Sequence, residues 1–352
     1  MPRGPAKLTT SRHGLNLQEA RLSDAYRKRL VHSGKVLSAW ASEQGLSLED
    51  AALSGQTMSE LLIRFLQDLF ELGSASWIGI HAVLAAQTRW RHLKGQLRGA
   101  WDSVSSWSML RPVCSRVPMP MVVVLALQRF AAFAATAFQP WKAHIWWPFA
   151  VAVLCAFHGL LRPGELWRLR AEDVRTPGLR SLLTAPVAVF TIREPKNLRF
   201  GGRLQVRAVR APLPVAWISW LVRDLPRGSP IWPFGPRVFA ICLREALSFL
   251  GLGQLSLTPS SFRAGGATWL FEEGVSISNI RFAGSWSSER VLSHYLQEAE
   301  AAASLLDVSE ASARSLERFM DALSFAAEPP RLPYQQLAAR WMPVAPTTFA
   351  RR

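Results

Sequence analysis

Two apolar segments in the middle of the chain, residues 119–138 and 145–161, constrain the fold more than any other feature of the sequence. The first segment is interrupted by Gln128 and Arg129, and the second is shorter than the ~20 residues that a membrane-spanning helix needs. We therefore interpret both as buried core helices, and we expect no membrane partner. With 49% hydrophobic residues, the chain has ample apolar material for a globular fold.

A length of 352 residues suggests about two domains, and the proline-containing segment 111–120 marks a boundary between them. Helical periodicity predicts a helical domain over 15–110, preceded by a disordered basic arm at 1–14. A second domain is predicted over 119–326, and the proline-rich residues 327–352 are expected to form a loose tail. The predicted fold class is mainly α with a small antiparallel β-sheet.

The sheet is predicted from a period of two between residues 186 and 211. Apolar and polar side chains alternate there, with Leu204, Val206 and Ala208 against Arg203, Gln205 and Arg207. Residues 194–202 would form the hairpin loop. This loop contains Lys196, which is the only lysine after Lys142.

The chain carries a net charge of +16, divided as +8 over residues 1–150, +8 over 151–299 and zero over the rest. Two basic domains favour double-stranded DNA as the partner, because each cation that neutralises a phosphate releases counterions. Charge alone leaves a membrane surface or acidic proteins open. Only six of the 41 basic residues are lysine, and arginine is the side chain that forks onto phosphate.

Residues 87–101 predict a basic amphipathic helix. Its apolar face would carry Trp90, Leu93, Leu97 and Trp101, and its basic residues are Arg89, Arg91, Lys94 and Arg98. A solvated charged face and a DNA-binding face are about equally common for such a helix, and the charge of the whole chain favours DNA.

No cofactor and no metal are expected. The three cysteines, Cys114, Cys155 and Cys242, have no ligand spacing and imply a reducing compartment. The sequence contains no phosphate loop, dinucleotide fingerprint, zinc-protease motif or nucleophile elbow.

An ordered set of residues in the second domain carries the functional prediction. LLRPGELWRLRAEDV contains Arg162 and Glu165, LTPSSFRAGG contains Arg263 in the first turn of a predicted helix, and FAGSWSSERVLSHYLQ contains Trp286 and Tyr295. We expect Tyr295 on a helix over 288–299. This set resembles the motifs of the tyrosine recombinase (phage integrase) family, and the block 258–296 is particularly similar to a bacteriophage member.

The resemblance implies a role for each residue. Tyr295 would attack a phosphodiester to give a 3′-phosphotyrosyl intermediate, Arg162 and Arg263 would hold the non-bridging oxygens, and Glu165 would support Arg162. Trp286 would donate its indole N–H, and Lys196 would protonate the leaving 5′-oxygen. The family also implies a two-domain clamp on DNA, with 15–110 as the core-binding domain, and a homotetramer on DNA.

Ser260 departs from the family pattern, which usually has histidine three residues before the second arginine. Serine at a helix start is often a simple N-cap. The alternative prediction is therefore a weakened or inactive, domesticated DNA-binding descendant, and a third class is a helical interaction protein. The motif LRPGEL resembles recombinases of eukaryotic mobile elements, which would imply a nuclear location, with the cytoplasm expected otherwise.

Each of these residues also has a structural interpretation. Taken alone, Trp286 would be interpreted as a core residue, and Tyr295 as a packing residue with its hydroxyl at the surface. Arg162 would be interpreted as the partner of Glu165 in an ion pair. It is their order and spacing that favour the active site. After Tyr295, an apolar stripe of Leu316, Phe319, Met320 and Leu323 predicts either a contact with a neighbouring subunit or packing on its own domain.

Overall fold

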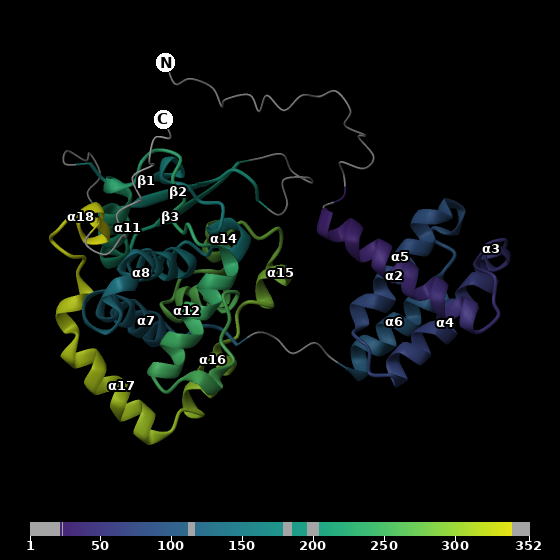
Figure 1. The fold of residues 1–352 in the computed structure, drawn as a ribbon. Helices are drawn as coiled ribbons and strands as arrows, with labels where there is room; N and C mark the ends of the chain where they lie inside the picture. The colour runs from purple at the N-terminus through teal and green to yellow at the C-terminus, as the bar shows by residue number, and fades with distance from the viewer. Residues whose placement is uncertain (1–21, 23, 112–116, 179–184, 196–203, 340–352) are drawn as a thin grey trace, which may run out of the picture. The chain divides into compact units, whose positions relative to one another are not determined.

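The computed structural model describes residues 22, 24–111, 117–178, 185–195 and 204–339. The chain divides into two compact units, Met1–Cys114 and Ser115–Arg352, which we call unit 1 and unit 2 and describe separately (Figure 1). The predicted arm at 1–14 and the predicted lysine Lys196 lie outside the described residues.

Unit 1 consists of helices around one apolar core. Its elements are α2 (Asp24–Glu43), α3 (Leu48–Ala51), α4 (Gly55–Glu71), α5 (Ser76–Arg89), the 3₁₀ turn η1 (Arg91–Leu93) and α6 (Arg98–Leu110). Helix α4 begins where the Ser54 hydroxyl accepts a hydrogen bond from the Gln56 amide, at 3.2 Å. Its side chains at helical spacing, Met58, Leu62 and Phe65, are fully buried in the core.

The prediction of one basic helix over 87–101 is wrong. Helix α5 ends at Arg89, and the chain passes through η1 and through Gly95, which has a positive φ of 88°, before α6 begins at Arg98. The break lets Leu93 and Leu97 both be fully buried. The four basic side chains are all exposed, but they belong to three separate segments.

Unit 2 is mainly helical with one small sheet, as the sequence predicts. Its elements in chain order are α7 (Met121–Phe133), the π-turn η2 (Ala134–Phe138), η3 (Pro140–Lys142), α8 (Ala143–His158), α9 (Pro163–Leu166), η4 (Ala171–Asp173), β1 (Val174–Arg175), β2 (Ala188–Ile192), β3 (Gln205–Val209), α11 (Pro212–Asp224), α12 (Gly235–Phe249), η5 (Gly253–Leu255), α13 (Ser261–Glu272), α14 (Ile277–Gly284), α15 (Glu289–Ser293), α16 (Glu298–Leu306), α17 (Glu310–Ala322), η6 (Ser324–Ala327) and α18 (Tyr334–Ala339).

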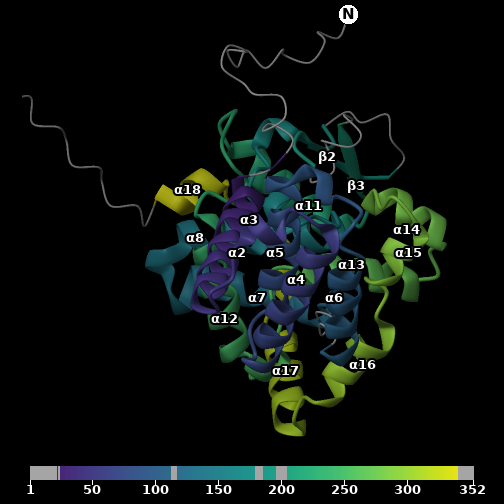
Figure 2. The same cartoon turned by 90° about the vertical axis from the view of Figure 1, so that its right-hand side faces the viewer.

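The two apolar segments form α7 and α8, which pack together at the centre of unit 2, as predicted (Figures 1 and 2). Helix α8 buries almost every side chain, including Trp146, Phe149 and Phe157. Among the described residues, the stretch Met121–Phe138 is long and apolar enough to cross a membrane by length and composition alone. Of that stretch, 56% is buried inside the protein.

The sheet has the order β1-β2-β3 and is antiparallel throughout, which confirms the predicted hairpin. It lies at one end of unit 2 (Figure 1). Val206 is 58% exposed whereas Arg207 is 1% exposed, so the side of β3 that carries Val206 faces outward and the side that carries Arg207 is buried. Arg207 pairs across the sheet with the buried Phe190, so both side chains point into the core.

The prediction of one helix over 288–299 is also wrong. Helix α15 ends at Ser293, and Tyr295 lies in a turn before α16 begins at Glu298. The Tyr295 amide bonds to the carbonyl of Leu292, three residues back, at 2.7 Å.

The segment after residue 310 packs on unit 2 itself. Phe319 of α17 meets the rings of Phe133 and Phe249, with centroids 6.1 and 5.9 Å apart, and Arg129 donates to the carbonyl of Met320 at 2.9 Å. The apolar stripe therefore packs on its own domain, which is the second of the two predicted possibilities.

The expected loose tail is docked over its described part. The indoles of Trp217 and Trp220 on α11 donate to the carbonyls of Ala327 and Leu332, at 2.6 and 3.0 Å. Tyr334 is buried, and its amide donates to the Asp224 carboxylate at 2.6 Å. Helix α17 ends at Ala322, before the prolines, and tryptophan donors on α11 satisfy the carbonyls of the chain that follows.

Candidate active site

The candidate site is organised around one buried carboxylate, that of Glu165. Arg162 precedes α9, and its backbone amide and its Nη1 donate to the two oxygens of Glu165, at 2.9 and 2.7 Å. Pro163 occupies the first helical position, where its missing N–H costs nothing, so the i,i+3 spacing brings this pair together. The Glu165 side chain is only 2% exposed.

Two further arginines approach the same carboxylate. Nη2 of Arg207 lies 3.8 Å and Nη1 of Arg263 lies 4.0 Å from Oε2 of Glu165. Burial alone would raise the pKa of Glu165, but the Arg162 amide and the three guanidinium charges outweigh burial and hold that pKa below its usual range. Glu165 is therefore an anion at neutral pH, surrounded by three cations.

Arg263 is fixed by two backbone carbonyls. It lies in the first turn of α13, and its two Nη atoms donate to the carbonyl of Leu160 and, at 2.7 Å, to the carbonyl of Gly284. Leu160 and Ser285 are both in the left-handed region, with φ of 49°. Such strain is uncommon outside glycine, and here it occurs at or beside both carbonyls that hold the arginine.

Trp286 and Tyr295 cover Arg263. The guanidinium carbon of Arg263 lies 4.1 Å from the centre of the Trp286 ring and 5.6 Å from that of Tyr295. The two rings meet edge to face at 5.2 Å. Burial, reinforced by the charges of Arg162 and Arg207, lowers the pKa of Arg263, and its side chain is 2% exposed.

Close backbone approaches set this arrangement. A Cβ at Gly266 would collide with the carbonyl of Phe157, so glycine lets α13 lie against the end of α8. A Cβ at Gly284 would collide with the Trp286 ring, so glycine leaves room for the indole over Arg263. The two positions place Arg263 and Trp286 against one another.

Arg207 is a member of this cluster that we did not predict. It donates to the carbonyl of Ala283 at 2.9 Å and to Gln205 at 3.0 Å, in addition to its approach to Glu165. Arg207 and Arg263 thus donate to consecutive carbonyls, those of Ala283 and Gly284. The strand register would have revealed Arg207, since its cross-strand partner Phe190 belongs to an evident apolar run.

Three buried N–H donors of the cluster have no hydrogen-bond partner among the residues that the structure describes. They are Nε of Arg207, Nε of Arg263 and Nε1 of Trp286. Buried donors are normally satisfied, and an unpaired one costs about 1–3 kcal/mol. Arg207 and Arg263 donate through their Nη atoms to the carbonyls of Ala283 and Gly284, so all three side chains with an unpaired donor meet at the turn 283–286.

The predicted residues Arg162, Glu165, Arg263, Trp286 and Tyr295 therefore form one chain of contacts, although they span 134 positions of the sequence. Arg263 and Trp286 are buried, so these residues do not lie together on an open basic surface. Ser260 directly precedes α13 and is half-buried, and its hydroxyl makes no capping bond. The predicted position of Lys196 stays a prediction.

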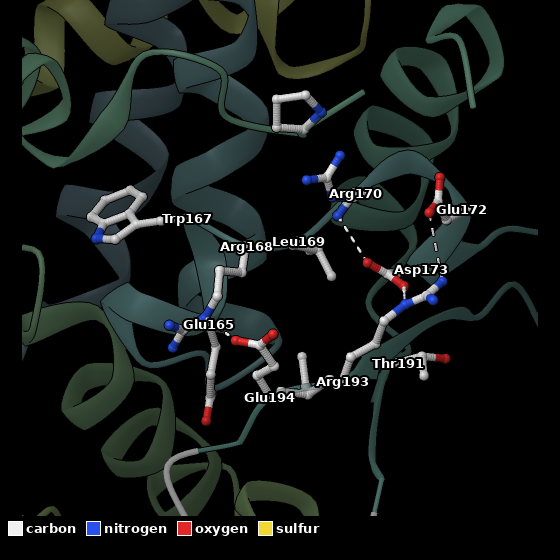
Figure 3. A pocket seen from close by; sticks show the side chains of 12 residues that line it. Glu165, Trp167, Arg168, Leu169, Arg170, Glu172, Asp173, Thr191, Arg193 and Glu194 are labelled. Carbon is white, nitrogen blue, oxygen red and sulfur yellow. Dashed lines mark hydrogen bonds and ion pairs between the residues drawn. The ribbon is translucent and has the colours of Figure 1, made fainter. Parts of the chain in front are cut away.

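A hollow of about 270 Å³ adjoins Glu165 at the end of β2. Figure 3 shows that Arg193 and Asp173 point toward one another on one side of it, while Arg168 faces Glu194, at 3.7 Å, on another. The buried Asp173 thus ties the end of β2, which leads toward residue 196, to η4.

The predicted DNA-binding residues of unit 1 are all exposed, and Arg89 already has partners within the unit. Arg89 pairs with Glu49 at 2.5 Å and lies over the Trp90 ring at 4.6 Å, and both members of the ion pair are well exposed. Arg91, Lys94 and Arg98 are exposed as well.

Comparison with known proteins gives weak likenesses. No family model matches the chain, and no curated protein matches it. Solved structures that are similar to it include the XerH site-specific recombinase bound to its difH substrate in a pre-cleavage complex (13% identity, 71% of this chain and 70% of that chain, TM-score 0.42), the XerA recombinase (14%, 88% and 99%, 0.37) and the Tn1549 transposon integrase in complex with transposon right-end DNA (13%, 89% and 96%, 0.43). At such low identities and TM-scores, these similarities do not support a functional assignment. The functional proposal depends instead on the geometry of the arginine cluster.

Proposed function

We propose that this protein is a site-specific DNA recombinase of the tyrosine type. Tyr295 would attack a phosphodiester of duplex DNA, forming a bond from its oxygen to phosphorus while the bond to the 5′-oxygen breaks. The products are a 3′-phosphotyrosyl link and a free 5′-hydroxyl, so the bond energy is conserved for rejoining.

One observation carries this proposal: Arg263 and Trp286, each with a buried N–H donor that has no partner among the described residues, both contact the ring of Tyr295. A phosphodiester in transfer concentrates negative charge on its non-bridging oxygens, and fixed donors stabilise that charge without reorganising. Two carbonyls, and the approach to Glu165, fix the orientation of Arg263 in advance.

The remaining roles follow from residue chemistry. Arg162 is the most accessible arginine of the three, with 19% of its side chain exposed, and would be the first to meet a phosphate. Lys196 would protonate the leaving 5′-oxygen, which arginine cannot do because it does not release its proton. Exposed basic residues of both units would hold the DNA backbone, and a homotetramer would assemble on two sites.

A second candidate function is DNA binding without cleavage. Ser260 stands where the resemblance implies a histidine, and loss of one donor to the transition state typically costs about a hundred- to a thousand-fold in rate. Arg263 is also covered by Trp286 and Tyr295, so its donors reach a phosphate only if the two rings move.

A covalent-capture experiment separates the two candidates. The full chain is incubated with a pool of nicked duplexes of randomised sequence, in which the cleaved end diffuses away and rejoining is prevented. Adducts that survive denaturant are isolated and sequenced, and native complexes are recovered in parallel. Tyr295→Phe is the matched control, because it removes only the nucleophilic hydroxyl.

We expect denaturant-resistant adducts with the wild-type chain, enriched in one sequence, and none with Tyr295→Phe. Native complexes without adducts would support DNA binding without cleavage and would overturn the proposal that the protein is a recombinase. Absence of both adducts and complexes would overturn both candidates and leave a helical interaction protein.

A further inference from the structure

Tyr295 is held by a side chain that no motif of the sequence indicates. The hydroxyl of Thr268 donates to the carbonyl of Tyr295 at 3.1 Å and accepts from the amide of Gln297 at 3.3 Å. Thr268 lies on α13 and is 2% exposed. One hydroxyl therefore ties the chain on both sides of residue 296 to the helix that carries Arg263.

These two bonds stand in place of the i to i−4 backbone hydrogen bonds that a continuous helix would make around Tyr295. Tyr295 lies between α15 and α16, in a stretch where no helix fixes the backbone dihedral angles. Without Thr268, the carbonyl of Tyr295 and the amide of Gln297 would each lose a buried partner.

The geometry of Thr268 differs from that of other helical threonines in this chain. The hydroxyls of Thr88 in α5 and Thr136 in η2 donate to carbonyls only four residues earlier in the chain, at 2.7 and 2.9 Å. That local bond is the usual alternative for a threonine within a helix. Thr268 instead reaches outward to a segment 27 residues later in the sequence.

The position of Thr268 on α13 matters because Arg263 precedes it by five residues, about 7.5 Å along the helix axis. The same rigid helix thus fixes the guanidinium and the backbone of the tyrosine. The Tyr295 ring also contacts Trp286, so its orientation is limited from two sides.

We propose that Thr268 is a positioning residue that anchors the backbone of Tyr295 to α13, so that the tyrosine hydroxyl is delivered to the phosphate held by Arg263 of the same chain. The proposal rests on the proposed function for its catalytic consequence. The anchor itself is independent of that function.

The test compares Thr268→Val, which keeps the shape and removes the hydroxyl, with Thr268→Ser, which keeps the hydroxyl. Thr136→Val is the matched control, since it removes a hydroxyl that bonds only to carbonyls three and four residues earlier. Amide hydrogen exchange of residues 294–297 and thermal unfolding are measured on the full chain. Adduct formation is measured under single turnover, with the duplex selected in the capture experiment.

We expect faster exchange in Thr268→Val and wild-type protection in Thr268→Ser and Thr136→Val. At saturating protein, the adduct rate of Thr268→Val should fall by about a hundred-fold, the usual cost of a nucleophile misplaced by about 1 Å, while the concentration for half-saturation is unchanged. Thr268→Ser should recover most of the rate.

Unchanged exchange in Thr268→Val would overturn the anchor. Faster exchange with an unchanged adduct rate would overturn the positioning role, as would a loss that Thr268→Ser does not recover. Altered exchange in a protein whose wild-type form makes no adduct would instead overturn the proposed function and leave the anchor standing.

Discussion

Glu165→Gln is the substitution that tests the arginine cluster most directly. It keeps the size of the side chain but removes the charge that faces Arg162, Arg207 and Arg263, at 2.7, 3.8 and 4.0 Å. Removing one partner from a buried ion pair typically costs about 3–5 kcal/mol, because the remaining charge is left uncompensated. Since a domain has only about 5–15 kcal/mol of net stability, unit 2 should be markedly weakened.

The effect should depend on pH in a defined direction. The pKa of Glu165 is held below its usual range, so its carboxylate contributes stability above the ordinary glutamate value of about 4.3 and loses it as the pH falls through the folded-state value. The wild-type chain and Glu165→Gln should therefore differ fully at neutral pH and converge below that value.

Chemical unfolding of the full chain at a series of pH values measures this difference. Glu310→Gln is the control, since its pair with Arg314 is equally short, at 2.7 Å, but has 56% and 80% exposed partners and should contribute only about 0.3–0.5 kcal/mol. Inorganic phosphate should stabilise Glu165→Gln more than the wild-type chain, because three uncompensated guanidiniums gain from an anion. The electrostatic explanation would be refuted if both substitutions lowered the free energy of unfolding by the same small amount. It would also be refuted if the wild-type chain and Glu165→Gln still differed in stability at acidic pH.

Four other outcomes are expected. Arg263→Lys should slow adduct formation far more than it weakens DNA binding, because lysine keeps the charge and loses the planar fork, and equal losses would make Arg263 a plain phosphate contact. Lys196→Ala should cleave poorly with a natural duplex but recover with a 5′-bridging sulfur, because a thiolate leaves without a proton; no recovery would remove Lys196 as the acid. Gly284→Ala should displace the indole of Trp286 and lower the adduct rate by about a hundred-fold at unchanged DNA affinity, as a binding titration would check. Phe319→Ala should lower the stability of unit 2 by less than the about 3–5 kcal/mol of a fully buried phenylalanine, without changing the assembly state in sedimentation; a change in that state would restore an interface role.

The order and chemical type of the motif residues were enough to predict most of the cluster. Arg162 and Glu165 are three residues apart at a helix start marked by proline, so their contact follows from local geometry. Arg263, Trp286 and Tyr295 come from distant segments, and the resemblance to a family supplied what spacing alone could not. The apolar segments around α7 and α8 gave the core of unit 2, since no other placement buries so many large side chains.

Arg207 and Thr268 were missed for different physical reasons. Alternation in a strand separates two faces but does not say which one is buried, and a buried arginine becomes tolerable only when a distant carboxylate and carbonyls receive it. Nothing in the sequence around Thr268 distinguishes it from other residues within a helix. Its role depends on a turn that lies 27 residues further along the chain. The same turn explains why Tyr295 is not helical, although its neighbours have helical spacing.

The long-range bonds of unit 2 have a consequence for how the chain folds as it is synthesised. Gln128 donates to the carbonyl of Ala326 across 198 residues, and Arg129 donates to the carbonyl of Met320 across 191. Loops of this length close late, because their entropy must be lost before the contacts form. We infer that the part of α7 that contacts residues 320–326 stays uncovered during synthesis until residue 326 has appeared. Unit 1, whose core is complete within its own 114 residues, is free to fold before that.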